Sequence, residues 1–301
     1  MSPRDEHRYV IVGAGAIGGT VGAVLARAGI PTVLVARGAH ADVLAAEGLT
    51  LRTPDGTFPT PVTAAAQAEQ VRLTEDDVLV FATKTQQLDA ALQEWVDQPV
   101  HSADGVVGTA GERLPAMTAL NGVAAEEKAL RYFRRVFGVC VWLPAVHLQP
   151  GEVIVRSWPV AGQFHIATVA RVDQHAGHIV AAARREGEDV LRCAGIEFTS
   201  FETSTAARAD GPTIRVVPGW DARASNSTWQ SLSRNTGNVE TDFLNGEIVR
   251  LAHRHGTSAP LNAALARVAR AEVRNGLGPG RYSASELTDL LGAHAITPAR
   301  D

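Results

Sequence analysis

Short apolar runs alternate with helical patterns in the first part of the chain. Tyr9–Val12 is an apolar run closed by Gly13, which predicts a buried strand. Ala16–Ala28 carries apolar residues on one face and is followed by Gly29, a typical residue after a helix end, so we expect a helix there. A second strand is predicted at Thr32–Ala36. The short connections favour a β-α-β unit with two parallel strands.

A turn signal and several later apolar runs extend this pattern. Pro54–Gly56 lies between Leu49–Arg52 and Thr57–Val62, and this arrangement predicts a hairpin. Further strands are predicted at Val78–Ala82, Met117–Leu120, Val136–Leu143 and Phe164–Ala167.

The pattern becomes helical after about residue 172. His178–Ala194 predicts a helix that Gly195 ends, and residues 203–227 predict a long polar loop. Helical spacing then resumes from Thr228, through Val239, Phe243, Leu244, Ile248 and Leu251. Two more helices are predicted, a long one at Leu261–Val273 and a short one at Ser285–Leu291. The chain therefore divides into a mixed domain, residues 1–172, and an all-helical domain, residues 173–301.

Composition narrows the class of protein. Of the 301 residues, 45% are hydrophobic and 5% aromatic, as in α/β globular enzymes. A net charge of −4 gives no basic field that would attract nucleic acid.

The cysteines and histidines indicate neither a disulfide nor a metal site. Cys140 and Cys193 lie far apart in the sequence, so we expect reduced thiols. His253 and His255 face different sides of a predicted helix, so we expect no metal site there. A polar start and the lack of a long apolar run favour a cytoplasmic protein without membrane contact.

A glycine-rich sequence, Gly13–Gly18, joins the first predicted strand to the first predicted helix. It reads G-x-G-x-x-G, and this context is the one that dinucleotide-binding Rossmann domains require. Gly13 permits a tight turn, Gly15 lets the backbone approach a pyrophosphate, and Gly18 lets the helix pack closely on the sheet. The helix start would offer its N–H groups to the phosphates.

The residue after the second strand indicates which cofactor binds. Enzymes that use NAD usually carry Asp or Glu about 20 residues after the glycines, where it binds the ribose 2′-hydroxyl. This chain has Arg37 there, and a guanidinium can bind a 2′-phosphate with two hydrogen bonds. We therefore expect NADP.

Several motifs in order resemble the ketopantoate reductase (2-dehydropantoate 2-reductase) family. They are Gly13–Gly19 with Arg37, Val80–Gln87, Asn121–Val123, Thr228–Leu232 followed by Val239–Ile248, His255–Gly256 and Pro260–Asn262. The resemblance implies transfer of hydride from NADPH to the ketone of a small 2-keto acid, as in pantothenate biosynthesis. A homodimer is compatible with it.

The resemblance also implies roles for single residues. Glu240 would orient the substrate, Asn121 would lie between nicotinamide and substrate, and Thr228 or Ser227 would bind the substrate. The expected cofactor-binding residues are Gly13, Gly15, Ala16, Ile17, Gly18, Arg37, Lys84, Gln87 and Asn121.

One part of the family pattern has no counterpart in this chain. The family's proton donor is a lysine on a helix ahead of the glutamate, whereas this chain has no lysine after Lys128. Lys84, His165 or a water held by Glu240 could replace it. The chain therefore resembles a divergent member of the family, and we expect it to lack the lysine helix. Two alternatives stay open: a non-catalytic NADP-binding regulator or partner subunit, and a reductase of imines or other ketones with a rebuilt acid site.

Overall fold

The computed structural model describes residues 7–122, 124–167, 177–198, 211–219, 240–276 and 291. The chain divides into two units. The first comprises Met1–Ala170 with Gly211–Asn226, and the second comprises Arg171–Asp210 with Ser227–Asp301. The described segment 211–219 therefore returns to the first unit, which a single boundary at residue 172 does not capture.

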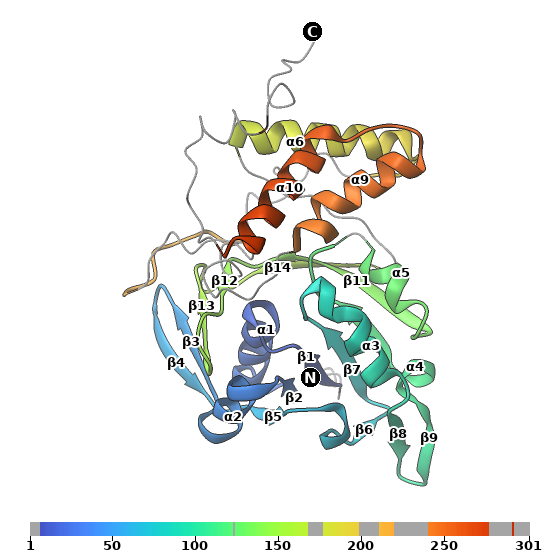
Figure 1. Ribbon diagram of the computed structural model, residues 1–301. Helices are drawn as coiled ribbons and strands as arrows, with labels where there is room; N and C mark the ends of the chain where they lie inside the picture. Colours follow the sequence, from blue (N-terminus) through green and yellow to red (C-terminus); the bar gives the residue numbers. More distant parts are fainter. Residues whose placement is uncertain are drawn as a thin grey trace. The chain divides into compact units, whose positions relative to one another are not determined.

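The first unit is built on a seven-stranded sheet (Figure 1). In spatial order its strands are β14 (Gln163–Ala167), β11 (Arg135–Trp142), β10 (Pro115–Thr118), β7 (Asp77–Phe81), β1 (Arg8–Val12), β2 (Thr32–Val35) and β5 (Thr63–Ala65). Only the β11–β14 pair is antiparallel among these neighbours. The predicted α/β class is confirmed, and the strands predicted within this sheet lie within two residues of the observed ones.

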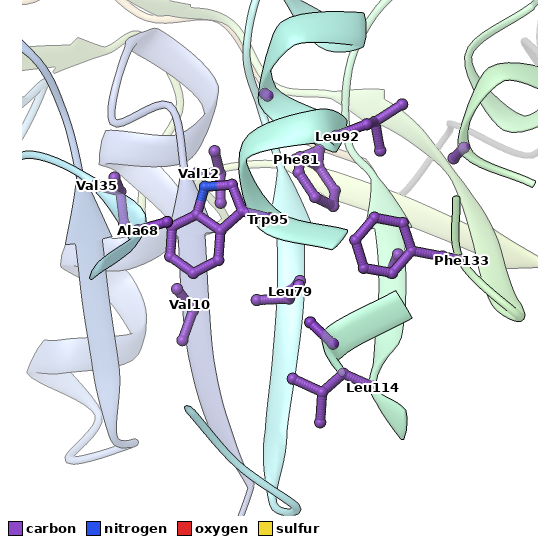
Figure 2. Packing of buried hydrophobic residues seen from close by; sticks show 14 of the residues in the cluster. Val10, Val12, Val35, Ala68, Leu79, Phe81, Leu92, Trp95, Leu114 and Phe133 are labelled. Carbon is purple, nitrogen blue, oxygen red and sulfur yellow. The ribbon is translucent and has the colours of Figure 1, made fainter. Parts of the chain in front are cut away.

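The alternation of side chains along β1 separates two buried cores. Val10 and Val12 join the core under α3 (Leu88–Val96), where Trp95 is fully buried. Figure 2 shows the Trp95 ring over Val10 and Leu79, beside Phe81 and Phe133. Ile11 points to the opposite face and joins the core under α1 (Ala16–Arg27) and α2 (Gly38–Glu47). The period of two thus buries both faces of a central parallel strand.

The order of the strands reverses beside β1. From β1 the chain proceeds outward to β2 and β5, then crosses back to β7 and β10 on the other side of β1. Open parallel sheets bind ligands at such a reversal, outside the carboxyl ends of the strands. The residues that follow Val12 and Phe81 lie at this position.

Two smaller sheets flank the main one. The predicted hairpin is confirmed as β3 (Leu49–Thr53) and β4 (Gly56–Thr60), which pair antiparallel. β3 also pairs with β13 (Glu152–Val155), and β13 pairs with β12 (Ala145–Val146). The other sheet contains β6 (Leu73–Thr74), β8 (Pro99–Ser102) and β9 (Gly105–Thr109).

The returning segment 211–219 is fixed to the hairpin side of the first unit. Arg215 forms an ion pair with Asp55 at 2.7 Å, and its backbone N–H donates to the Arg156 carbonyl at 2.6 Å. Arg52 Nη2 donates to the Pro218 carbonyl at 2.9 Å. These contacts explain why the segment belongs to the first unit.

The second unit is helical where it is described. It contains α6 (Gly177–Cys193), the 3-10 helix η3 (Glu240–Phe243), α9 (Asn245–Arg254) and α10 (Pro260–Arg274). Val190 of α6 packs with Leu251 of α9. The helices predicted at His178–Ala194 and Leu261–Val273 are confirmed, whereas Ser285–Leu291 lies outside the described residues except for Leu291. No helix in the described ranges combines the length and apolarity needed to cross a bilayer.

Gly22 gives a test of the packing between α1 and the sheet. A Cβ at Gly22 would lie 2.2 Å from Cδ2 of Leu34, and Leu34 is fully buried on β2. Gly22→Ala should therefore lower the free energy of unfolding by about 1–3 kcal/mol through overpacking, although alanine is the better helix former. Urea denaturation measures the change.

Gly187 on α6 is the matched control for this substitution. A Cβ there would meet Ile248 at the ordinary contact distance of 3.7 Å. Gly187→Ala should stabilise its unit by about 0.5–1 kcal/mol. A stabilising Gly22→Ala would contradict the close packing of α1 on β2.

Candidate functional site

The glycine-rich turn lies at the carboxyl end of β1, where the strand order reverses. Gly13 adopts a φ of 100°, in the region that favours glycine. Its N–H and that of Ala14 both donate to the Val35 carbonyl at 3.0 Å. The end of β2 therefore holds the turn in place.

The three glycines of the motif are needed for different reasons. A Cβ at Gly13 would lie 2.9 Å from the Thr83 backbone nitrogen, and one at Gly18 would lie 2.2 Å from the Gly13 carbonyl oxygen. A Cβ at Gly15 would have no atom within 4 Å, and its φ of −75° is open to other residues. Packing among the described residues therefore explains Gly13 and Gly18, while Gly15 leaves a space beside the turn.

The surroundings of this space fit an anionic ligand. α1 begins at Ala16, and neither a capping side chain nor an acidic residue occupies its first turn. The first N–H groups of a helix lack intrahelical acceptors, and the positive end of its dipole attracts anions. Ile17 and Gly18 belong to this first turn. The buried Thr83 hydroxyl oxygen also has no hydrogen-bond partner among the described residues. A nucleotide pyrophosphate fits this donor set.

Two further turns meet at the same edge of the sheet. Lys84 and Gln87 lie at the ends of the turn after β7, where the 3-10 helix η2 (Thr85–Gln87) forms. The Thr85 hydroxyl donates to the backbone carbonyl of Asn121, in the turn after β10. Lys84 is half-buried and Gln87 is exposed. The structure thus brings the predicted residues of the first unit to one edge of the sheet.

Arg37 lies just beyond β2, at the N-cap of α2. Its side chain is 72% exposed and forms an ion pair with Glu94 of α3. The sequence placed Arg37 at this end of β2 but gave no sign of Glu94, which lies 57 residues further along the chain.

His40 is a second residue that the sequence did not single out. Its Nδ1 accepts the Gly151 N–H at 2.9 Å, and its Nε2 lies 2.8 Å from the Ala14 carbonyl. Since Nδ1 is an acceptor, the proton of the neutral ring is on Nε2, which donates to Ala14. Burial lowers the pKa of His40, and the hydrogen bond to Ala14 opposes that shift. His147 packs against it with ring centroids 4.3 Å apart. His40 therefore links the glycine turn to the β12–β13 connection.

A buried carboxyl supports the turn that contains Asn121. The hydroxyl of Thr118, at the end of β10, donates to Glu126 Oε1 at 2.9 Å. Glu126 belongs to α5 (Ala125–Ala129). Burial raises the pKa of its carboxyl, and hydrogen bonds from its own N–H and from Thr118 oppose the shift.

Glu240 belongs to the second unit, where it begins η3. Glu240 is only 4% exposed, whereas most glutamates at the start of a helix are exposed to solvent. The next residue, Thr241, donates to Asn245, and Asn245 donates to Asn262 at 2.9 Å. Asn245 and Asn262, which belong to the sequence motifs noted above, therefore hold η3 in place through hydrogen bonds.

A second set of hydrogen bonds joins the start of α10, where Asn262 lies, to α6. Both carboxylate oxygens of Glu186 accept backbone N–H groups at the start of α10, from Leu261 at 2.9 Å and from Asn262 at 2.8 Å. The proposed substrate residues Thr228 and Ser227 lie outside the described residues.

The chain is similar in sequence to known proteins over most of its length. A family model described as "Ketopantoate reductase PanE/ApbA" matches residues 9–171, and its C-terminal counterpart matches residues 164–273. A 2-dehydropantoate 2-reductase of Mesorhizobium japonicum is 38% identical over 117 residues, which cover 38% of this chain and 32% of that protein. The match therefore spans about a third of the curated relative.

Solved structures share the fold. A PanE/ApbA family ketopantoate reductase from Ralstonia eutropha JMP134 has 22% identity and a TM-score of 0.66, covering 89% of this chain and 99% of that one. D-mandelate dehydrogenase in complex with NADH and anilino(oxo)acetate has 17% identity and a TM-score of 0.62, with the same coverage. A 2-dehydropantoate 2-reductase from Geobacter metallireducens GS-15 has 18% identity and a TM-score of 0.57, covering 88% and 99%.

The contacts of His40 predict a pH dependence of stability. Because its pKa is lower in the folded chain than in the unfolded chain, the unfolded chain binds the proton first. The contribution of His40 is therefore complete above about pH 6.5 and is lost as the pH falls through the lowered folded pKa. We expect the free energy of unfolding to fall less at low pH for His40→Gln than for the wild type, because glutamine keeps a donor near Ala14 and does not titrate. Urea denaturation at a series of pH values measures this difference.

The exposed residue His253 supplies the control for this prediction. His253→Gln should retain the pH dependence of the wild type. Identical profiles for His40→Gln and the wild type would exclude a role for His40 titration.

Proposed function

The chain belongs to the ketopantoate reductase family, and on that premise we propose that it is an NADPH-dependent reductase of a small 2-keto acid. The observation that carries the proposal is the space beside Gly15. It lies next to the uncapped start of α1, at the carboxyl edge of the sheet. No contact among the described residues requires glycine there, and a pyrophosphate is the group that the motif accommodates.

The residues around this space would divide the recognition of the cofactor. The N–H groups of Ala16, Ile17 and Gly18 would bind phosphate oxygens, and Arg37 would bind the 2′-phosphate. Lys84, Gln87 and Asn121 would line the nicotinamide half. NADPH would supply the hydride that the reaction consumes.

Asn121 and Glu240 would orient the substrate. The Thr85 hydroxyl fixes the backbone of Asn121, and the chain of side chains from Thr241 to Asn262 fixes the start of η3. By family resemblance, Thr228 and Ser227 would contact the substrate.

The supply of the proton separates this proposal from a second candidate. Hydride transfer to a ketone leaves an alkoxide, which must gain a proton, and an ionised glutamate has the wrong charge to stabilise it. This chain has no lysine after Lys128. That observation favours the alternative of a non-catalytic NADP-binding member. In a catalytic member, Lys84, His165 or a water held by Glu240 would supply the proton.

The space beside Gly15 gives a direct test of nucleotide binding. Gly15→Val should reduce NADPH affinity below detection because its branched side chain would fill the space of the pyrophosphate. No atom of the described residues lies within 4 Å of the new Cβ, so thermal unfolding without the nucleotide should be unchanged. Fluorescence titration measures binding, and Gly15→Ala should have an intermediate affinity. Normal binding by Gly15→Val would overturn the proposed nucleotide site.

Turnover separates the reductase from the non-catalytic member. NADPH oxidation should be measured with a panel of 2-keto acids, ketopantoate first. We expect binding with slow turnover, below the ordinary range of about 1–10³ per second, since loss of a general acid costs about 10²–10⁴-fold. Glu240→Gln should lower the rate at least about tenfold without changing NADPH affinity.

Asp242 offers a control in the same short helix. Its side chain is 51% exposed and pairs with Arg270, so Asp242→Asn should leave the rate unchanged. NADPH binding without turnover of any keto acid would support the non-catalytic alternative. An ordinary rate on ketopantoate would show that the missing lysine has been fully replaced.

A further inference from the structure

The ion pair between Arg37 and Glu94 places a carboxylate at the position expected to recognise the ribose. Arg37 Nη2 donates to Glu94 Oε2. The two side chains differ in exposure, since Arg37 is 72% exposed and Glu94 only 21%. The guanidinium therefore extends into solvent, while the carboxylate is partly enclosed.

Glu94 is held independently of Arg37. Its other carboxylate oxygen, Oε1, accepts the Ala68 N–H at 3.3 Å, in the turn that follows β5. Gln98 donates to the Glu94 backbone carbonyl at 3.1 Å, and the neighbouring Trp95 is fully buried in the core under α3. The backbone and the carboxylate of Glu94 are thus both fixed, so its negative charge stays in place when Arg37 moves.

The pair is linked to the glycine turn through the end of β2. Val35 accepts hydrogen bonds from Gly13 and Ala14, and Arg37 follows two residues later. In Rossmann domains the residue at this point meets the 2′ position of the adenosine ribose. A 2′-phosphate bound by Arg37 would therefore be close to the Glu94 carboxylate.

We propose that Glu94 determines cofactor specificity by weakening the preference for NADPH, so that this chain uses both NADPH and NADH. This proposal rests on the nucleotide site proposed above. A 2′-phosphate would compete with Glu94 for the guanidinium and be repelled by the carboxylate. A 2′-hydroxyl could instead donate a hydrogen bond to the same carboxylate. Arg37 therefore favours NADPH, and Glu94 favours NADH.

The test compares the dissociation constants of NADPH and NADH for the wild type and Glu94→Gln. Fluorescence titration should show wild-type constants within about tenfold of each other. Glu94→Gln should bind NADPH about tenfold more tightly, because one nearby negative charge is removed, and NADH no more tightly than before. The gain should shrink as salt is added, because Arg37 is exposed.

A second ion pair in the first unit provides a matched control. Glu75 pairs with Arg113 at 2.7 Å, both are 46% exposed, and Glu75 lies ahead of β7 at the opposite edge of the sheet. Glu75→Gln should leave both constants unchanged. A change in cofactor preference in this variant would show that the effect is not local to Arg37, and would overturn the proposal.

Arg37→Ala separates this inference from the proposed function. In the wild-type background this substitution should weaken the binding of NADPH and leave the affinity for NADH nearly unchanged. If it does so while Glu94→Gln keeps the wild-type preference, the role of Glu94 is excluded and the nucleotide site stands. If the wild type binds neither nucleotide, the proposed function itself fails. If Glu94→Gln does not fold, the wild type alone still tests the inference. A wild-type preference for NADPH above about 100-fold would overturn it, because that is roughly the full value of a charge-assisted contact.

Discussion

The first unit depends on one close approach, where the backbone of Gly13 lies against the Ala82–Thr83 peptide. A Cβ at Gly13 would be 2.9 Å from the Thr83 nitrogen, so the contact requires the absence of a side chain. It joins the turns after β1 and β7, the two strands between which the chain reverses its direction across the sheet. The Val35 carbonyl then binds the same turn from the other side. One backbone junction therefore positions both the glycine-rich turn and the end of β2, where the phosphates and the ribose of the proposed cofactor would lie.

The groups around that junction have opposing charges, and their balance decides what can bind. The uncapped start of α1 and the guanidinium of Arg37 attract anions, whereas the fixed carboxylate of Glu94 repels them. His40 contributes no charge while its ring is neutral, and its hydrogen bond to Ala14 restrains the turn. In the proposed nucleotide site, phosphate would be bound through backbone dipoles and selectivity would be set by two side chains.

Local signals in the sequence were sufficient for six of the seven strands of the main sheet, for the hairpin and for the glycine-rich turn, but not for β5 or the other short strands. β1, β7 and the hairpin follow from short apolar runs and turn residues, which act within a few positions. α2 escaped prediction because it buries only Ala41 and Leu44, too few for a helical stripe. His40 and Glu94 could not be found because their partners are distant in sequence; Gly151, for example, lies 111 positions after His40. The burial of Glu240 likewise depends on packing, while Thr228 and Ser227 lie outside the described residues.

The distribution of charges constrains any catalytic cycle in this chain. The residues that would hold the cofactor belong to the first unit, and Glu240 belongs to the second. In the family pattern the cation that protonates the alkoxide accompanies the glutamate, but both lysines of this chain precede the second unit. Lys128 pairs with Asp89 at 2.7 Å, and Lys84 lies at the N-cap of η2, in the turn after β7. In the proposed reductase, a proton from either lysine would therefore come from the first unit, which is also the unit that would hold the cofactor.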